Sequence, residues 1–116
     1  FAAPLHVHRN EDEFFLVLSG EIRLQHHDEV MEGVTGSLAY TPRGIGHSFH
    51  VDSDEARILL IFGPAGVEEF FRDVATPARW FGLPPADEPL KDRGTLIEIM
   101  SRHGQTVLGP PLGPKS

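Results

Sequence analysis

The first half of the chain alternates short apolar segments with polar and turn-forming ones. Each apolar segment has the length of a β-strand and is too short for a typical helix. Glycine, proline or clustered charges separate the segments, for example at residues 33–36, 42–44 and 52–55. Such spacing favours antiparallel strands joined by tight turns, in a sandwich or barrel. The predicted strands cover residues 5–7, 14–18, 21–25, 30–32, 37–41, 47–51 and 56–62.

One of these segments, residues 14–18, is apolar at every position instead of alternating. Neighbouring side chains of a strand point to opposite sides of its sheet. A continuous apolar run is therefore typical of a strand that is covered on both faces. We expect the helices to cover part of this apolar surface.

After residue 63 the spacing of apolar residues changes from that of strands to that of helices. Between residues 67 and 74 the apolar side chains follow the i, i+3, i+4, i+7 spacing of a short amphipathic helix. A second helix is expected over about residues 93–103, with Asp92 as its N-cap and Gly104 just after its end.

At 116 residues the chain has the size of one domain with one core. We expect a barrel core over residues 1–63. Residues 64–116 are expected to pack on it as an extension with the two helices, a Pro-rich loop over residues 75–90 and an extended tail over residues 108–116. The predicted fold class is mainly all-β, an antiparallel barrel with a short C-terminal helical extension.

Composition excludes some classes of partner. The formal net charge of −7 argues against non-specific binding to nucleic acids or anionic membranes, both of which need a basic surface. No apolar run approaches the roughly 20 residues that span a bilayer. The chain has no cysteine, so any metal must be bound by histidine and carboxylate side chains. The lack of cysteine also fits a cytoplasmic location.

Three histidines and one glutamate are candidate metal ligands. His6 and His8 are two residues apart on a predicted strand, so both side chains point to one face. Glu13 follows a polar loop, and a chain reversal there would let it face the same interior from the next strand. His47 comes from a distant strand and completes the set. A shell of imidazole and carboxylate suits one divalent ion of Fe, Mn, Co, Ni, Cu or Zn, with positions left for substrate or dioxygen.

The remaining histidines fit other roles. His26 and His27 lie at a predicted hairpin tip and are expected at the surface. His50 has the opposite parity to His47 on the same strand, so it should point away from the site. His103 suits the negative end of a helix dipole.

The polar loop before Glu13 holds two further carboxylates. We interpret Glu11 and Asp12 as a solvated loop face. Asp12 is the substitute ligand if the register of the site is one residue shorter.

The two segments that carry the candidate ligands resemble the two motifs of the cupin superfamily, which are small antiparallel β-barrels of jelly-roll type. They read His6-x-His8-x4-Glu13-x6-Gly20 and Gly36-x5-Pro42-x-Gly44-x2-His47. The resemblance covers residues 4–51, and residues 64–71 and 82–85 are similar to single-domain bacterial cupins of the quercetin 2,3-dioxygenase-like type. It implies that His6, His8, Glu13 and His47 are the metal ligands.

The sequence departs from the family pattern in two places. The first motif usually opens with a glycine that is separated from its first histidine by five intervening residues, a position that here precedes Phe1. We therefore expect N-terminal barrel strands to be missing from the given sequence. Val51 stands where the second motif often ends in asparagine, which removes a polar group near the site but no ligand.

The resemblance implies an oxidoreductase, a dioxygenase acting on a flavonol-like or other enolisable aromatic substrate. Glu13 would then be both a ligand and the catalytic base that takes the hydroxyl proton of the substrate. A non-catalytic module that binds or senses a small molecule and a cupin isomerase stay open as alternatives. The expected partners are a small-molecule substrate, dioxygen and a second copy of the chain, since uncovered apolar strands and family habit favour a homodimer. The candidate pocket residues are Phe15, Leu24, Tyr40, Phe49 and Phe62.

Overall fold

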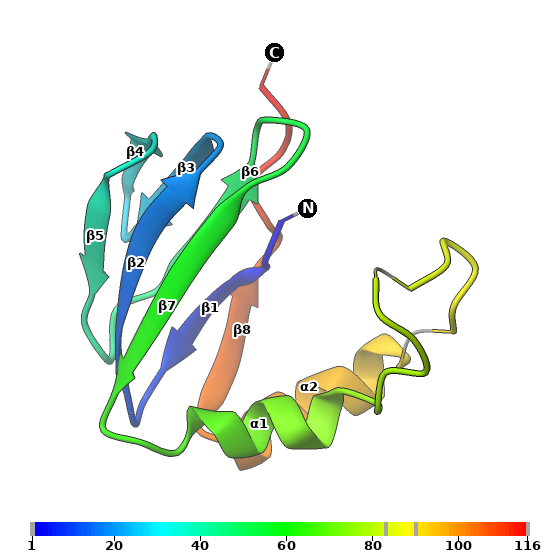
Figure 1. Ribbon diagram of the computed structural model, residues 1–116. Coiled ribbons are helices and arrows are strands. Elements are labelled where there is room, and N and C mark those ends of the chain that lie inside the picture. Colours follow the sequence, from blue (N-terminus) through cyan, green and yellow to red (C-terminus); the bar gives the residue numbers. More distant parts are fainter. Residues whose placement is uncertain (1, 83, 90, 116) are drawn as a thin grey trace.

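The computed structural model describes residues 2–82, 84–89 and 91–115. Two antiparallel sheets face each other (Figure 1), one with the strand order β4-β3-β6-β1-β8 and the other with the order β5-β2-β7. The prediction of a mainly β fold is confirmed. The elements are β1 (Leu5–His8), β2 (Asp12–Ser19), β3 (Ile22–His26), β4 (Glu29–Gly33), β5 (Leu38–Thr41), β6 (His47–Val51), β7 (Arg57–Gly63), α1 (Val67–Val74), α2 (Arg93–Arg102) and β8 (Gln105–Gly109).

The core lies between the two sheets. Phe15 and Val17 of β2 point into it from one sheet, and Ile22 and Leu24 of β3 meet them from the other. These four side chains are 1–3% exposed, so they are almost completely removed from water. Alternate residues of each strand supply them, as the two-residue period of a strand requires.

The outer side of the three-stranded sheet differs from expectation. Residues 14–18 were predicted to be covered on both faces, but Leu18 is 47% exposed. No helix lies over β2 and β7 within the described part of the chain; both helices sit at one end of the sheets (Figure 1). We call this surface the outer apolar face, and its exposed members are Leu18, Leu38, Tyr40, Leu59 and Ile61.

Both predicted helices form. Helix α1 has the predicted bounds, and α2 begins after Asp92, whose side chain accepts a hydrogen bond of 3.0 Å from the backbone N–H of Thr95. Gly104 has a φ of +76°, a left-handed conformation that disfavours other residues, and it ends this helical segment. Neither helix of the described residues is long and apolar enough to cross a membrane.

Strand β8 was not predicted. Residues 105–109 pair antiparallel with β1 along its whole length, with Gln105 opposite His8 and Val107 opposite His6. The segment after residue 63 therefore contributes a strand to the five-stranded sheet and does not only pack against a finished barrel. The strand exists because the free edge of β1 offers unpaired backbone groups, which a short segment can satisfy whatever its own apolar pattern.

Candidate metal centre

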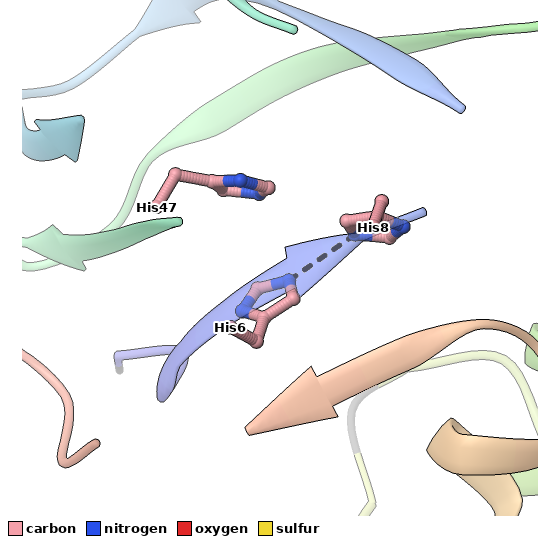
Figure 2. A group of neighbouring side chains, drawn as sticks. All are labelled: His6, His8 and His47. Atoms are coloured by element: carbon pink, nitrogen blue, oxygen red, sulfur yellow. Dashed lines mark hydrogen bonds between the residues drawn. The ribbon is translucent and has the colours of Figure 1, made fainter. Parts of the chain in front are cut away.

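Three imidazoles converge between the sheets. His6 and His8 project inward from β1, and His47, the first residue of β6, stands opposite His6 in the register of these strands. Each histidine offers one ring nitrogen, and the three nitrogens lie within 4.8 Å of one another. Figure 2 shows the rings turned toward a shared centre from two neighbouring strands.

Glu13 approaches this centre from the opposite sheet. It lies near the start of β2, and its side chain is on the same face as the core residue Phe15. Its Oε2 is 2.9 Å from Nε2 of His47 and 3.6 Å from Nε2 of His8. The carboxylate is 4% exposed, so four potential donor groups meet in a nearly dry interior.

Neighbouring acceptors orient two of the rings. Nδ1 of His6 lies 2.7 Å from the carbonyl oxygen of Pro4, and Nδ1 of His8 lies 3.1 Å from Oε1 of Glu11. Each acceptor holds the proton on Nδ1, which leaves the lone pair of Nε2 facing the centre. Glu11 is 5% exposed, so its interpretation as part of a solvated loop face was wrong.

The spacing of the donor atoms fits a metal ion. Nε2 of His6 and Nε2 of His8 are 3.2 Å apart, although both rings have their proton on the other nitrogen. Two lone pairs facing one another at this distance repel unless a cation lies between them. Ligand atoms about 2.1 Å from one ion are about 3.0–3.4 Å apart at angles near 90–110°. The N···N and N···O separations of 2.9–3.6 Å bracket that range.

Buried atoms without hydrogen-bond partners among the described residues also indicate that a metal ion fits this site. Oε2 of Glu13 and Nε2 of His47 are buried and lack hydrogen-bond partners among the described residues, despite their separation of 2.9 Å. Buried polar atoms are normally paired, because leaving one unpaired costs about 1–3 kcal/mol. The residues present therefore suit a divalent transition metal held by His6, His8, His47 and Glu13.

The surroundings of His6 favour the neutral form of its imidazole. Burial lowers the pKa of His6 from 6.5 to about 4, and this effect outweighs its hydrogen bond to Pro4, which acts in the opposite direction. The neighbouring His47 and His8 lower it further. A neutral ring keeps its Nε2 lone pair available at physiological pH, which a metal ligand requires.

The lowered pKa of His6 predicts a loss of stability in acid. Between pH 6.5 and about 4 the unfolded chain binds a proton at His6 that the folded chain does not, so stability falls as the pH falls. We expect the metal-free protein to lose about 2 kcal/mol of unfolding free energy from this group between pH 7 and 4.5. Urea unfolding at both pH values measures it. The loss should be smaller by that amount in His6→Gln, and an unchanged loss in this variant would contradict the assignment.

The other histidines divide between the two faces of the sheet. His27 is exposed at the turn, and His50 points outward to Asp52, with Nδ1 2.8 Å from Oδ1, both as predicted. His26 differs from prediction, because it pairs in register with His47 and so shares its inward face. Its Nε2 is buried, without a hydrogen-bond partner in the described ranges.

Two remaining predictions concern polar groups outside the cluster. Asp12 does not substitute for Glu13, because it lies on the opposite face of β2 and accepts a hydrogen bond of 2.8 Å from the backbone N–H of Arg43. His103 caps α2, and its Nε2 lies 2.6 Å from Oδ2 of Asp73 on α1. It thus joins the two helices.

Four of the five candidate pocket residues face inward. Phe15 lies against both His47 and Phe49, with ring centroids 5.9 and 5.7 Å away. Phe62 lies 5.8 Å from the ring of His8. Leu24 lines the interior from β3.

Tyr40 was wrongly predicted to line the pocket. It is 49% exposed on the outer apolar face and stacks on Phe14 with a centroid distance of 4.7 Å. Register explains the difference, because Thr41 pairs with the inward-facing Glu13 and its neighbour must point the other way.

A cavity adjoins the inward-facing residues. It has a volume of about 280 Å³ and lies between β2, β3, β4 and β5, with Phe15, Val17, Ile22 and Leu24 among its walls. Phe15 lies between this cavity and His47, since it lines the cavity and its ring also contacts the ring of His47.

Gln105 was missed as a member of the site. It lies on β8 opposite His8, is 3% exposed, and its Nε2 is buried without a hydrogen-bond partner among the described residues. No local signal marks it, because the strand that carries it depends on pairing with β1.

Comparison with known proteins identifies the family to which the chain belongs. The Cupin domain family model matches residues 2–62, more than half of the chain. The matched region contains His6, His8, Glu13 and His47, and it ends before α1, α2 and β8.

Individual relatives cover parts of the chain. An uncharacterized protein of Streptomyces coelicolor is 35% identical over 54 residues, 47% of this chain and 51% of that protein. Quercetin 2,3-dioxygenase of Bacillus subtilis is 30% identical over 84 residues, 72% of this chain and 25% of the enzyme. The chain thus spans about half the length of the first relative and a quarter of the second. A solved structure of B. subtilis oxalate decarboxylase, which has Mn(II) centres, shares 28% identity and a TM-score of 0.50 over 58% of this chain and 19% of its own.

Proposed function

Because this chain belongs to the cupin family, we propose that it is a metal-dependent dioxygenase for a flavonol-like or other enolisable aromatic substrate. Membership confirms the resemblance drawn from the two histidine-bearing motifs. The observation that carries the proposal is the buried convergence of three imidazole nitrogens with the unpartnered carboxylate oxygen of Glu13. The similarity to quercetin 2,3-dioxygenase supports the choice of reaction.

In this proposal His6, His8, His47 and Glu13 hold the ion. A bound divalent metal supplies positive charge that favours the deprotonated oxygen of a hydroxy-enone. Glu13 would take the hydroxyl proton, because its carboxylate is a base beside the cluster: its Oε2 lies 2.9 Å from Nε2 of His47 and has no hydrogen-bond partner among the described residues. With a flavonol-like substrate, the resulting enolate would react with dioxygen so that one oxygen atom bonds to each of the two ring carbons that flank the hydroxyl-bearing carbon. The O–O bond and the two C–C bonds to that carbon would then break. The heterocycle would open, the hydroxyl-bearing carbon would leave as carbon monoxide, and both atoms of dioxygen would remain in the product.

The interior suits an aromatic ligand beside the cluster. The cavity of about 280 Å³ is walled mainly by apolar side chains, and Phe15 and Phe49 provide aromatic faces near His47. Such walls exclude water and hold a flat ring by contact, while a few polar groups fix its orientation. Phe15 would set how closely a ring approaches the histidines.

Oxygen consumption tests the proposal. The protein is stripped of metal, reloaded separately with Fe, Mn, Co, Ni or Cu, and mixed with quercetin in an oxygen-electrode cell. At least one loaded form should consume dioxygen well above the metal-free protein. Absence of uptake by every form that holds stoichiometric metal would contradict the dioxygenase.

We also propose that the outer apolar face joins two copies of the chain. Leu59 and Ile61 are 47% and 49% exposed on β7, at one edge of the three-stranded sheet, and Leu38 and Tyr40 are exposed on β5, at its other edge. Contiguous apolar surface of this kind marks an interaction site, and the same patch on two copies can form a two-fold interface.

Light scattering after gel filtration tests this interface. The unaltered chain should have the mass of a dimer, and Leu59→Glu should have the mass of a monomer, since a carboxylate would be buried unpaired. Val30→Glu is the matched control, because Val30 is 52% exposed on the other sheet and should leave the dimer intact. A monomeric unaltered chain would contradict the proposal.

A further inference from the structure

Gln105 is a buried polar residue that the proposed reaction does not use. It lies on β8, which runs beside β1 and is drawn in orange next to the histidines in Figure 2. Directly opposed residues on antiparallel strands share a face, so Gln105 is on the same side of the sheet as His8. Its residue number places it outside the segment matched by the family model.

The side-chain amide nitrogen of Gln105 is buried without a hydrogen-bond partner among the described residues. The side chain is 3% exposed, and its Nε2 has no hydrogen-bond acceptor within the described residues. An unpaired buried amide is costly, and glutamine is seldom buried without partners. A glutamine at this position therefore indicates an acceptor that the folded chain does not itself supply.

The neighbouring residues of β8 indicate where that acceptor would lie. Opposite His6, the same strand presents Val107, which has no polar side-chain atom. Of these two inward-facing residues of β8, the one with a side-chain hydrogen-bond donor is Gln105, which lies next to His8. A ligand oxygen held there would lie beside the cluster, and cross-strand neighbours have Cβ atoms only about 4.5–5.5 Å apart.

We infer that Gln105 binds and orients the ligand of the metal centre, with Nε2 donating to one of two oxygens on neighbouring carbon atoms. This inference rests on the proposed function, because the other oxygen is the one directed at the metal. It takes the 3-hydroxy-enone of the proposed function as the ligand and assigns a recognition role to the C-terminal strand.

Binding of maltol to the cobalt-loaded protein tests the inference. Maltol is a small 3-hydroxy-4-pyranone, and its affinity can be measured by titration without any turnover. Gln105→Leu should bind maltol about tenfold more weakly at unchanged cobalt content, because it removes one hydrogen bond to the ligand in a buried site. Gln105→Glu, which presents an acceptor in place of the donor, should be no better. Thr106→Val on the same strand is exposed and should match the unaltered protein.

The outcomes separate this inference from the dioxygenase. Equal maltol affinity in Gln105→Leu, or no maltol binding by the unaltered cobalt protein, would overturn it. Loss of cobalt from Gln105→Leu would also overturn it, by showing that Gln105 supports His8 and not the ligand. If Gln105→Leu does not fold, Gln105→Glu decides, since it keeps the size of the side chain. A tenfold loss of maltol affinity in Gln105→Leu, together with no oxygen uptake by the unaltered protein on quercetin, would support the role of Gln105 in ligand binding and contradict the dioxygenase.

Discussion

Replacing His47 by alanine is expected to lower the affinity for a divalent transition metal by on the order of a hundredfold or more. Loss of a residue that only orients a ligand costs about 10–100-fold, so loss of a ligand costs at least as much. His47 is 2% exposed, and its Nε2 lies 2.9 Å from Oε2 of Glu13. Its removal also leaves that carboxylate buried with the imidazole of His8, 3.6 Å away, as its remaining neighbour of this kind among the described residues. Metal content after dialysis and calorimetric titration measure the effect.

His27→Ala is the matched control for this experiment. Its side chain is 76% exposed at a turn in the same sheet, so it should bind metal like the unaltered protein. Equal metal affinity of His47→Ala and His27→Ala would refute the metal centre, and with it the proposed reaction.

Replacing Glu13 by glutamine is expected to reduce turnover by about 10²–10⁴-fold while much of the metal is retained. The amide oxygen of glutamine can still approach the ion, but the amide cannot take a proton from a substrate hydroxyl. Oxygen uptake and metal content, measured on the same samples, separate the two roles. A parallel loss of both would mean that Glu13 acts only as a ligand.

Asp12→Asn provides the comparison for Glu13. Asp12 is the preceding residue, but it faces away from the histidines and binds Arg43, so turnover should be unchanged. If Asp12→Asn lost more activity than Glu13→Gln, the ligand register would be one residue shorter than the structure indicates.

Local pattern was enough to predict most elements of this fold. Apolar spacing located seven of the eight strands and both helices, because the periods of strand and helix are properties of consecutive residues. The same reasoning placed His6 and His8 on one face, since they are two positions apart on a strand. Odd spacing on a strand puts two side chains on opposite faces, so Asp12 lies opposite to Glu13 and His50 opposite to His47.

Parity does not say which face is the inner one. Tyr40 was assigned to the pocket because its strand was recognised but its register was not, and pairing of Thr41 with Glu13 turns it outward. His26 was placed at the surface because it adjoins a turn, yet its pairing with His47 turns it inward. Glu11 looked like a solvated loop residue until the fold brought its carboxylate to Nδ1 of His8.

By itself, the sequence determined seven of the eight strands, both helices, the acidic net charge and the residue types available to hold a metal. These depend on composition and on spacing along a few residues. Only the tertiary structure decided that Glu13 reaches the histidines from the opposite sheet and that β8 closes onto β1. It also decided that Gln105 is buried opposite His8, with no hydrogen-bond partner for its Nε2 among the described residues. The physical reason is that such contacts join residues far apart in the chain, and their energy depends on which faces meet and not on any local period.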